Sequence, residues 1–510
     1  MPRSCVTACL ALLLGALLGC QSDTASPPPA ASQARSDTAT AARVLIDGRF
    51  ADWPAGALQH TDPAGDGASI DLERVWVSHD AERLYVRFET GAPLNLQEGN
   101  ALALYLNTDG EASTGVTAHG AELVWRFGER TGTVVGPDGT QHTIAHEAIG
   151  FGSLPTVRAN RFELTLDRSA TPVANAPLFT ADTLRVALAA PGDAAPDQGS
   201  IAYVVTPVVS VPDLAPRTLD RTEGTLRVVA YNVLRSRLFD AGARSAYTRL
   251  FKALAPDVWG FSEIYERSAS ATRQVVAELL PGPTWHAAKA GLDLVAVSRY
   301  PILDSYAIPG YDDWKSAAFV LDTRERWGVP SLFILMHPPC CNFADGATTR
   351  NEMRQWVVDR VAAFIRDVRA GTAPVAVPAN APIFVGGDMN FVGHAQQPNT
   401  LRTGDIIHNA RLGPDAAPDW DRTPLVDARP RETHRPLHFT WIDPESSYPP
   451  GRLDYLYYSD SVLRATQSFV LNTQAMPPAV LSAHGLEASD TATASDHLPV
   501  VLDVRLRDTP

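Results

Sequence analysis

Six short polar motifs lie between residues 232 and 497 of the 510-residue chain, most of them where an apolar segment ends. Their side chains are carboxylates, amides and imidazoles, which are the groups that bind metal ions and transfer protons. Carboxylates held close together repel one another unless a cation lies between them, so this set predicts a metal site with oxygen ligands. In chain order the residues are Asn232, Glu263, His337, Asp388 with Asn390, Asp454, and Asp496 with His497.

Each motif alone is weak evidence, because Gly-Asp-x-Asn is a common turn and Ser-Asp-His is a plausible cap or loop. Together the six contain one candidate for each task in cleaving a phosphodiester. That reaction needs a cation to neutralise developing charge, a base to aim the water, and a donor for the departing oxygen. We therefore interpret the six motifs as one hydrolytic site.

The segments that must position these motifs alternate between strands and helices. Apolar segments such as 226–231 and 331–336 predict buried strands, and residues 247–254 predict a helix. A longer helix is predicted over residues 351–368, where large apolar side chains share one face. This alternation predicts an α/β domain of layered sheets flanked by helices over residues 225–510.

In this order the six motifs resemble the endonuclease/exonuclease/phosphatase family, which includes pancreatic-type deoxyribonucleases, exonuclease III-like repair enzymes, neutral sphingomyelinases and inositol-polyphosphate 5-phosphatases. The resemblance spans residues 226–506. It implies a metal-dependent hydrolase of phosphoric ester bonds, with Glu263 as the principal metal ligand and with Asn232 and Asp496 on the metal or beside it. Oxygen ligands and phosphate chemistry favour Mg²⁺ or Mn²⁺. Ser262 stands where the family commonly has glutamine, which leaves the ligand itself in place.

The same resemblance implies roles in the chemical step for the remaining residues. Asp388 would orient and deprotonate the attacking water, and Asn390 would fix the phosphate or that water. His497, held in its tautomer by Asp454, would stabilise or protonate the phosphoryl oxygens. His337 would assist on the leaving-group side.

Residues 44–207 show a different pattern, in which short segments of alternating apolar and polar residues are separated by Gly, Asp, Pro and Asn. Alternation of this kind predicts an antiparallel β-sandwich. Asp109 and its neighbours are candidate calcium ligands, although acidic residues in such turns are more often plain turn formers. The domain contains four short motifs, Ile46-Asp47-Gly48, Asp52-Trp53-Pro54, Leu106-Asn107-Thr108-Asp109 and Thr114-Gly115. With these motifs it resembles family 9 carbohydrate-binding modules. The resemblance implies a glycan as a candidate partner.

The N-terminus resembles a bacterial lipoprotein signal. Arg3 precedes an apolar run over residues 6–19, which is too short to span a bilayer but suits a signal-peptide core. The run ends in Leu17-Leu18-Gly19-Cys20, a pattern in which cleavage falls before the cysteine and the cysteine is acylated. We expect residues 1–19 to be removed and Cys20 to carry lipid.

Residues 20–43 are rich in Ser, Thr, Ala and Pro and predict a flexible tether between the lipid and the first domain. Gln21 stands where Asp would indicate retention at the inner membrane, so we expect a lipid-anchored protein of the cell envelope, in the outer membrane. The anchor is then the protein's only expected membrane contact. Residues 208–224, with prolines and several charges, predict the linker between the domains.

Of the five cysteines, Cys340 and Cys341 remain after processing and lipidation, which excludes a disulfide-framework fold. An oxidising compartment would favour a bridge between them. Adjacent Cα atoms lie about 3.8 Å apart, however, and an unstrained disulfide needs roughly 4.4–6.8 Å. The sequence therefore leaves two alternatives for Cys340 and Cys341, a strained disulfide or two packed free thiols.

Charge and apolar surface bear on the substrate. The net charge is −14, yet residues 226–510 carry 28 basic and 31 acidic side chains, so this domain is nearly neutral. Arg235, Arg237, Arg350 and Arg354 are scattered candidates for contacts with nucleic acid. A lipid phosphodiesterase needs an exposed apolar hairpin near its site. Residues 306–314 hold aromatic side chains and are a candidate, although the same side chains could equally be packed.

We expect a phosphodiesterase, with nucleic acid slightly ahead of phospholipid or sphingomyelin, and with a soluble phosphate ester as a further alternative. A different class is a non-catalytic surface lipoprotein that binds glycans through the sandwich and keeps an inactive hydrolase fold. Intact residues at all six motifs argue against that class. No obligate protein partner is inferred.

Overall fold

The computed structural model describes most of the chain beyond the predicted signal and tether, namely residues 44–116, 119–206, 217–310, 315–341, 344–345 and 348–507. The predicted lipidation site Cys20 lies outside these residues. So do most of the predicted linker and residues 311–314 of the candidate apolar hairpin. Within the described ranges no helix combines the length and the apolar character that a membrane span requires.

The alternating pattern of the first domain folds into a β-sandwich, as predicted, with antiparallel pairing throughout its described sheets. Phe88 and Phe162 from one sheet and Leu104 and Trp125 from the other are buried in a common core, because alternate side chains of each strand point inward. One sheet has the order β1 (Leu58–Thr61), β2 (Leu72–His79), β3 (Arg83–Leu94), β9 (Ala159–Asp167), β8 (Gly152–Leu154). The other has the order β11 (Asp193–Ala195), β10 (Thr183–Ala190), β4 (Ala103–Asn107), β5 (Leu123–Arg126), β6 (Thr131–Val135), β7 (Gln141–Ile144), with β12 (Ile201–Val204) also paired to β10.

The second domain is built on a pair of mixed sheets, which we call sheet A and sheet B. Sheet A has the order β15 (His286–Ala290), β16 (Leu294–Ser298), β14 (Val258–Ser262), β13 (Leu226–Asn232), β27 (Val500–Leu506), β26 (Leu463–Val470), β24 (Arg431–Glu432). Sheet B has the order β17 (Ile302–Ile308), β18 (Ser316–Leu321), β19 (Ser331–Met336), β22 (Ile383–Asp388), β25 (Asp454–Tyr458), β23 (Val426–Asp427). A short ribbon, β20 (Ala344–Asp345) with β21 (Thr348–Thr349), lies outside both.

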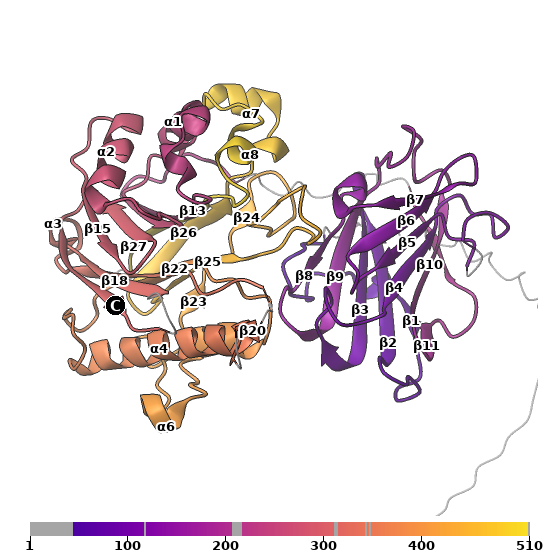
Figure 1. Ribbon diagram of the computed structural model, residues 1–510, viewed down its shortest axis with the longest axis horizontal. Coiled ribbons are helices and arrows are strands. Elements are labelled where there is room, and N and C mark those ends of the chain that lie inside the picture. The colour runs from indigo at the N-terminus through magenta and orange to yellow at the C-terminus, as the bar shows by residue number, and fades with distance from the viewer. Residues whose placement is uncertain are drawn as a thin grey trace, which may run out of the picture. The chain divides into compact units, whose positions relative to one another are not determined.

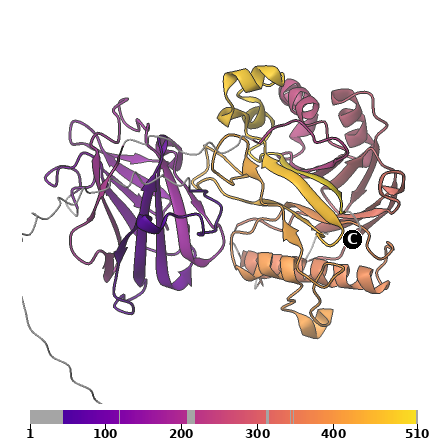
Figure 2. The same ribbon diagram turned by 180° about the vertical axis from the view of Figure 1, so that it is seen from behind.

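Helices cover the outer face of each sheet. Helices α1 (Arg244–Leu254) and α2 (Ala269–Leu279) pack on sheet A, where Phe251 stacks on Trp259 with ring centroids 4.1 Å apart. Helix α4 (Arg350–Ala370) covers sheet B through Val361 and its neighbours. The inner faces of the two sheets share a core that includes Val228 and Phe333. The described residues of this domain therefore form α/β/β/α layers, with α1 and α2 on one side of the strands in Figure 1 and α4 on the other, and Figure 2 shows the same layers from behind.

Local sequence explains where α4 begins and ends. Thr349 caps its N-terminus, since its side chain accepts a hydrogen bond from the backbone of Glu352 while the Glu352 carboxylate accepts one from the backbone of Thr349. Gly371 ends it in the left-handed conformation, with φ 72°. The predicted helices correspond to α1 and α4, whereas α2 was not predicted. Shorter helices are α3 (Arg324–Trp327), α5 (Gln396–Thr403), α6 (Asn409–Leu412), α7 (Pro478–Ala483) and α8 (Asp490–Ala494).

The two sheets approach closely at Gly260 in β14. A Cβ atom at this position would lie 2.3 Å from Cδ2 of Leu335 and 2.7 Å from the ring of Phe333, both on β19 of sheet B. Only glycine leaves room for these side chains, so Gly260 allows the strands that carry Glu263 and His337 to pack face to face.

Candidate active site

Strand ends of both sheets bring the predicted residues together. Asn232 is the last residue of β13 and Asp388 the last of β22, while Glu263 and His337 each follow a strand directly, β14 and β19. Asp454 begins β25, which runs antiparallel to β22, so it lies beside Asp388 at the same edge. His497 precedes β27, which is antiparallel to β13.

Asn232 links carboxylates of the two sheets. Its Nδ2 donates to Glu263 Oε1 at 3.0 Å and to Asp388 Oδ2 at 3.1 Å. Glu263 also accepts a hydrogen bond at Oε2 from the backbone N–H of Arg235, at 2.7 Å. These contacts orient the Glu263 carboxylate. Ser262, which stands where the family commonly has glutamine, adds none, because its buried hydroxyl has no hydrogen-bond partner among the described residues.

Asp388 lies between two imidazoles. Its Oδ2 is 3.7 Å from Nε2 of His497 and 3.5 Å from Nε2 of His337. The amide of Asn390 donates to the same oxygen at 2.9 Å and to the carbonyl of Pro338 at 3.1 Å. Asn390 adopts φ 48° and Glu263 φ 64°, left-handed conformations that non-glycine residues adopt at some cost and that cluster at functional sites.

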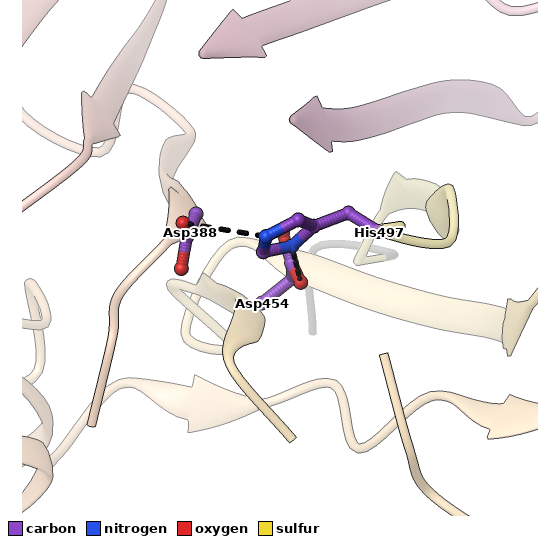
Figure 3. Close-up of side chains that lie close together, drawn as sticks. All are labelled: Asp388, Asp454 and His497. Atoms are coloured by element: carbon purple, nitrogen blue, oxygen red, sulfur yellow. Dashed lines mark hydrogen bonds and ion pairs between the residues drawn. The ribbon is translucent and has the colours of Figure 1, made fainter. Parts of the chain in front are cut away.

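Asp454 holds His497 from the side away from Asp388. Nδ1 of His497 lies 2.8 Å from Oδ2 of Asp454, so the Nε2 atom faces Asp388. Figure 3 shows this order, with the imidazole between the two carboxylates. The Asp454 side chain is fully buried, which excludes water as a competing partner for the imidazole.

His337 has an equivalent partner, Asp293, which the sequence analysis missed. Nδ1 of His337 lies 2.5 Å from Oδ2 of Asp293, and the same oxygen accepts a hydrogen bond from the backbone N–H of Glu263 at 3.1 Å. Asp293 directly precedes β16 and is fully buried. Its only sequence signal is a charged residue next to an apolar strand, and that signal does not indicate which histidine it meets.

Each imidazole–carboxylate pair joins the two sheets. Asp293 belongs to sheet A and His337 to sheet B, whereas Asp454 belongs to sheet B and His497 to sheet A. The Asn232–Asp388 hydrogen bond also crosses between them. The site therefore exists only where the two sheets are packed together.

Burial and neighbouring charges shift the proton affinities of these groups. Burial raises the pKa of Asp388 to about 6, and Asp454 adds to the effect while the two imidazoles oppose it. Burial alone would lower the pKa of His497, but Asp454 and Asp388 outweigh it and raise the pKa to about 10. In the same way Asp293 and Asp388 outweigh burial and raise the pKa of His337 to about 9. Both imidazoles therefore favour the protonated form at neutral pH, and Asp388 between them takes up a proton more readily than an ordinary carboxylate.

The residues present fit a divalent cation with oxygen ligands. Five carboxyl groups, those of Glu263, Asp293, Asp388, Asp454 and Asp496, surround the two imidazoles and leave an excess of acidic groups. Glu263 and Asp496 line a pocket that opens to solvent, so an ion could reach both.

The predicted ligands are not equivalent in the structure. The Asn232 oxygen accepts from the backbone N–H of Leu234 at 3.0 Å, and its nitrogen points at the carboxylates. Asp496 accepts from Trp441 Nε1 at 3.0 Å and from the Ser495 hydroxyl at 3.3 Å.

The pocket has a volume of about 460 Å³, which suits a compact ligand or one unit of a polymer. Cationic and aromatic side chains line it around the carboxylates, and these are Arg235, Lys315, Arg350, Tyr265, Trp441 and Tyr448. Arg235 and Arg350 are among the cations considered for nucleic acid. Arg354 is fully buried, and its guanidinium donates to the carbonyls of Pro339 and Cys341, so it holds the loop after His337 instead.

Cys340 and Cys341 line the same pocket as free thiols. The Cys341 thiol donates to Cys340 Sγ at 2.9 Å.

The sequence matches the model of the endonuclease/exonuclease/phosphatase family over residues 229–497. Comparison with curated proteins gives no significant match. Similar solved structures include a humanized D. rerio TDP2, 13% identical, which covers 56% of this chain and 100% of its own length with a TM-score of 0.33. Sphingomyelinase C from Streptomyces griseocarneus is 15% identical over 55% of this chain and 99% of its own, with a TM-score of 0.34. A Staphylococcus aureus beta-toxin variant with bound magnesium ions is 15% identical over 55% and 99%, with a TM-score of 0.32.

Proposed function

Because this chain belongs to the endonuclease/exonuclease/phosphatase family, whose members are hydrolases of phosphoester bonds, we propose that it cleaves phosphodiesters with the help of a divalent cation. The observation that carries the proposal is the position of Asp388, whose Oδ2 lies within 4 Å of Nε2 of both His337 and His497. Hydrolysis of a diester needs a base for the attacking water and donors for the phosphoryl and departing oxygens, and candidates for all of these meet here.

Each group then has a defined task. Asp388 accepts a proton from the water that attacks phosphorus, with Asn390 beside it to fix that water or the phosphate. His497, held by Asp454, donates to a phosphoryl oxygen as negative charge develops there. His337 donates a proton to the departing oxygen, so that an alcohol and a phosphomonoester result.

Glu263 would be the principal ligand of the cation, Mg²⁺ or Mn²⁺, with Asn232 and Asp496 on it or beside it. When bound, the ion supplies positive charge against the phosphoryl oxygens and lowers the repulsion between the diester and an anionic nucleophile. The acidic excess of the site supports this assignment, because a cation would balance it.

Metal dependence is tested on bis(p-nitrophenyl) phosphate. We expect activity with Mg²⁺ or Mn²⁺, loss of activity after chelation, and recovery when metal is returned. Glu263→Gln should raise the metal concentration needed for half-maximal activity by roughly 10–100-fold, because a neutral amide is a weaker ligand than a carboxylate. Glu266→Gln, an exposed residue of the same loop, is the matched control and should leave that concentration unchanged. Full activity of the chelated wild type, or an unchanged metal requirement in Glu263→Gln, would exclude the assignment.

Within this reaction class we propose a single-stranded nucleic acid as the substrate. Aromatic side chains stack on bases and cations contact the phosphates, and the pocket offers both beside the candidate catalytic groups. The alternatives are ranked by the rate of hydrolysis of three kinds of substrate. These are an oligonucleotide, vesicles of sphingomyelin or phosphatidylcholine, and a soluble phosphomonoester. Faster release from the vesicles would favour the lipid substrate.

Asp293 is, by the same proposal, a positioning residue for His337. Asp293→Asn should lower kcat by about tenfold or more on substrates whose leaving oxygen needs a proton, because the imidazole loses the charge that keeps it protonated. Bis(p-nitrophenyl) phosphate has an acidic leaving group and should lose less. The measurement is kcat on both substrates.

Asp304→Asn, at an exposed position on β17, is the control and should change neither rate. Equal losses on the two substrates in Asp293→Asn would show that Asp293 acts on something other than the leaving group.

We further propose that the enzyme works in the cell envelope, anchored by lipid at Cys20, and that the sandwich domain targets it, with a glycan as the candidate ligand. The apolar run and the Leu-Leu-Gly-Cys pattern of the N-terminus support the anchor. Mass analysis of the N-terminal peptide from the membrane fraction tests it.

A further inference from the structure

Four aspartates gather at one end of the sandwich domain. Asp62 follows β1 and Asp66 lies in the next turn, while Asp193 begins β11 and Asp197 follows that strand. One carboxylate oxygen of each lies within 4.8 Å of one from every other. The two pairs are more than a hundred residues apart in the chain, and they come from the two different sheets of the sandwich.

Asp62 carries an oxygen that lacks a partner. Its side chain is only 1% exposed. Oδ1 lies 2.8 Å from Nε2 of His60, but Oδ2 is buried and makes no hydrogen bond to any described residue. An unpaired oxygen on a buried carboxylate is costly, so in native proteins such an atom ordinarily meets a donor, a water molecule or an ion.

The charges around this oxygen favour an ion. Across the described residues, His60 is the only basic side chain within ion-pair distance of any of the four aspartates. The carboxylates of Asp193 and Asp197 lie close to that of Asp62, and a bound cation would balance their mutual repulsion. Asp193 is fixed in place, since its Oδ2 accepts a hydrogen bond from the backbone N–H of Leu72 at 2.6 Å. One carboxylate is thus preorganised and another is unsatisfied.

We propose that Asp62, Asp66, Asp193 and Asp197 bind one calcium ion. All four donors are carboxylate oxygens, which suit hard cations. Asp62 is buried whereas Asp66 and Asp197 are exposed, so the ion would be closed on the protein side and open to water on the other. Calcium accepts six to eight oxygen ligands in irregular geometry and takes water readily, whereas magnesium demands a near-ideal octahedron.

This calcium site differs from the one expected from the sequence, which was at Asp109 and its neighbours. The Asp109 oxygens accept hydrogen bonds from the backbone N–H of Glu111 and from the Thr114 hydroxyl, each at 2.8 Å. Asp109 is therefore satisfied within its own turn, as an ordinary turn former would be. The calcium ion would instead cross-link the segment after β1 to β11 and stabilise that end of the sandwich against separation of its sheets.

The test is calcium binding by the full chain, measured by equilibrium dialysis with radioactive calcium, together with thermal unfolding followed by circular dichroism. The variant is Asp66→Asn combined with Asp197→Asn, because both side chains are exposed and their replacement leaves the core intact. Asp109→Asn is the matched control. Since the catalytic pocket can also hold a divalent ion, the quantity compared is the number of calcium equivalents bound in each protein.

We expect the site to saturate at about 10⁻³ M calcium and the unfolding temperature to rise by about 2–6 °C. The double variant should lose one equivalent and the thermal shift, and Asp109→Asn should lose neither. Retention of that equivalent in the double variant would overturn the proposal, as would a wild type that calcium does not stabilise. Loss of the equivalent in Asp109→Asn alone would place the ion in the other turn and equally overturn it.

Discussion

Replacing Asp388 with asparagine should lower turnover by about 10²–10⁴-fold, because the amide retains a hydrogen-bond acceptor but cannot take a proton from water. Asp388 is the carboxylate that faces Nε2 of both imidazoles, and burial raises its pKa to about 6, close to the value that suits a base at neutral pH. The measurement is kcat on bis(p-nitrophenyl) phosphate at saturating Mg²⁺. Full activity at unchanged metal demand would remove Asp388 from the mechanism.

The stability of this variant provides a second readout. The pKa of Asp388 in the folded chain is above its ordinary value of 3.8, so folding favours the protonated form. The stability contributed by that form is lost as the pH rises from about 4 to about 6, and above that range the ionised carboxylate disfavours folding. Asparagine cannot ionise, so without divalent metal at pH 7 to 8 Asp388→Asn should unfold at the same temperature as the wild type or higher.

Asp419→Asn is the control for Asp388→Asn. Asp419 is also a buried carboxylate, and its oxygens accept hydrogen bonds from the backbone N–H groups of Trp420 and Ser461. Its replacement should leave kcat near that of the wild type. An inactive Asp388 variant that also unfolds early would point to structural damage instead of a lost base.

Replacing His497 with alanine should also lower kcat by about 10²–10⁴-fold, because the charge that develops on the phosphoryl oxygens loses its donor. The same change leaves the buried Asp454 carboxylate without its imidazole partner at 2.8 Å. We therefore expect His497→Ala to destabilise the fold by about 3–5 kcal/mol. Activity and thermal unfolding are measured on the same preparations.

A second variant separates the two effects. His497→Asn places an amide donor near the position of Nδ1, so the contact with Asp454 can be kept while Nε2 is lost. It should be as inactive as His497→Ala but closer to the wild type in stability. His408→Ala is the control, because His408 lies 2.5 Å from the buried carboxylate of Asp359, away from the pocket. Substantial activity in His497→Asn would show that Nε2 is not the donor.

Much of the fold and of the candidate site could be predicted from the sequence. Period-two alternation predicted the sandwich, because a strand with one buried face must alternate. The alternation of strands and helices predicted the layered domain. The set of motifs indicated that Asn232, Glu263, His337 and Asp388 would meet, since each lies at the end of a strand or directly after one. Helix α2 was missed because its buried face is short, although Ser268 accepts a hydrogen bond from Ala271 as an N-cap.

What the sequence could not supply is the pairing across the sheets. Asp293 has no motif of its own, and only the packing of sheet A on sheet B brings it to His337. The acidic group around Asp62 was missed for the same reason, since its members come from distant segments whose approach depends on the sandwich. Long-range contacts of this kind follow from packing and not from local pattern.

Packing of the two sheets also has a kinetic consequence. Asn232 and Asp388 are 156 residues apart in the chain and lie on different sheets, and each imidazole receives its carboxylate from the opposite sheet. During refolding, helices can form early, because their contacts are local. Sheet A must join β13 to β27 from opposite ends of the domain, and the two sheets must then dock, so both steps wait for distant segments to meet. A compact intermediate with both sheets formed but undocked would bind no substrate productively. Recovery of hydrolysis should then lag behind the return of secondary structure. Its rate would measure the docking of the two sheets, the last stage of folding.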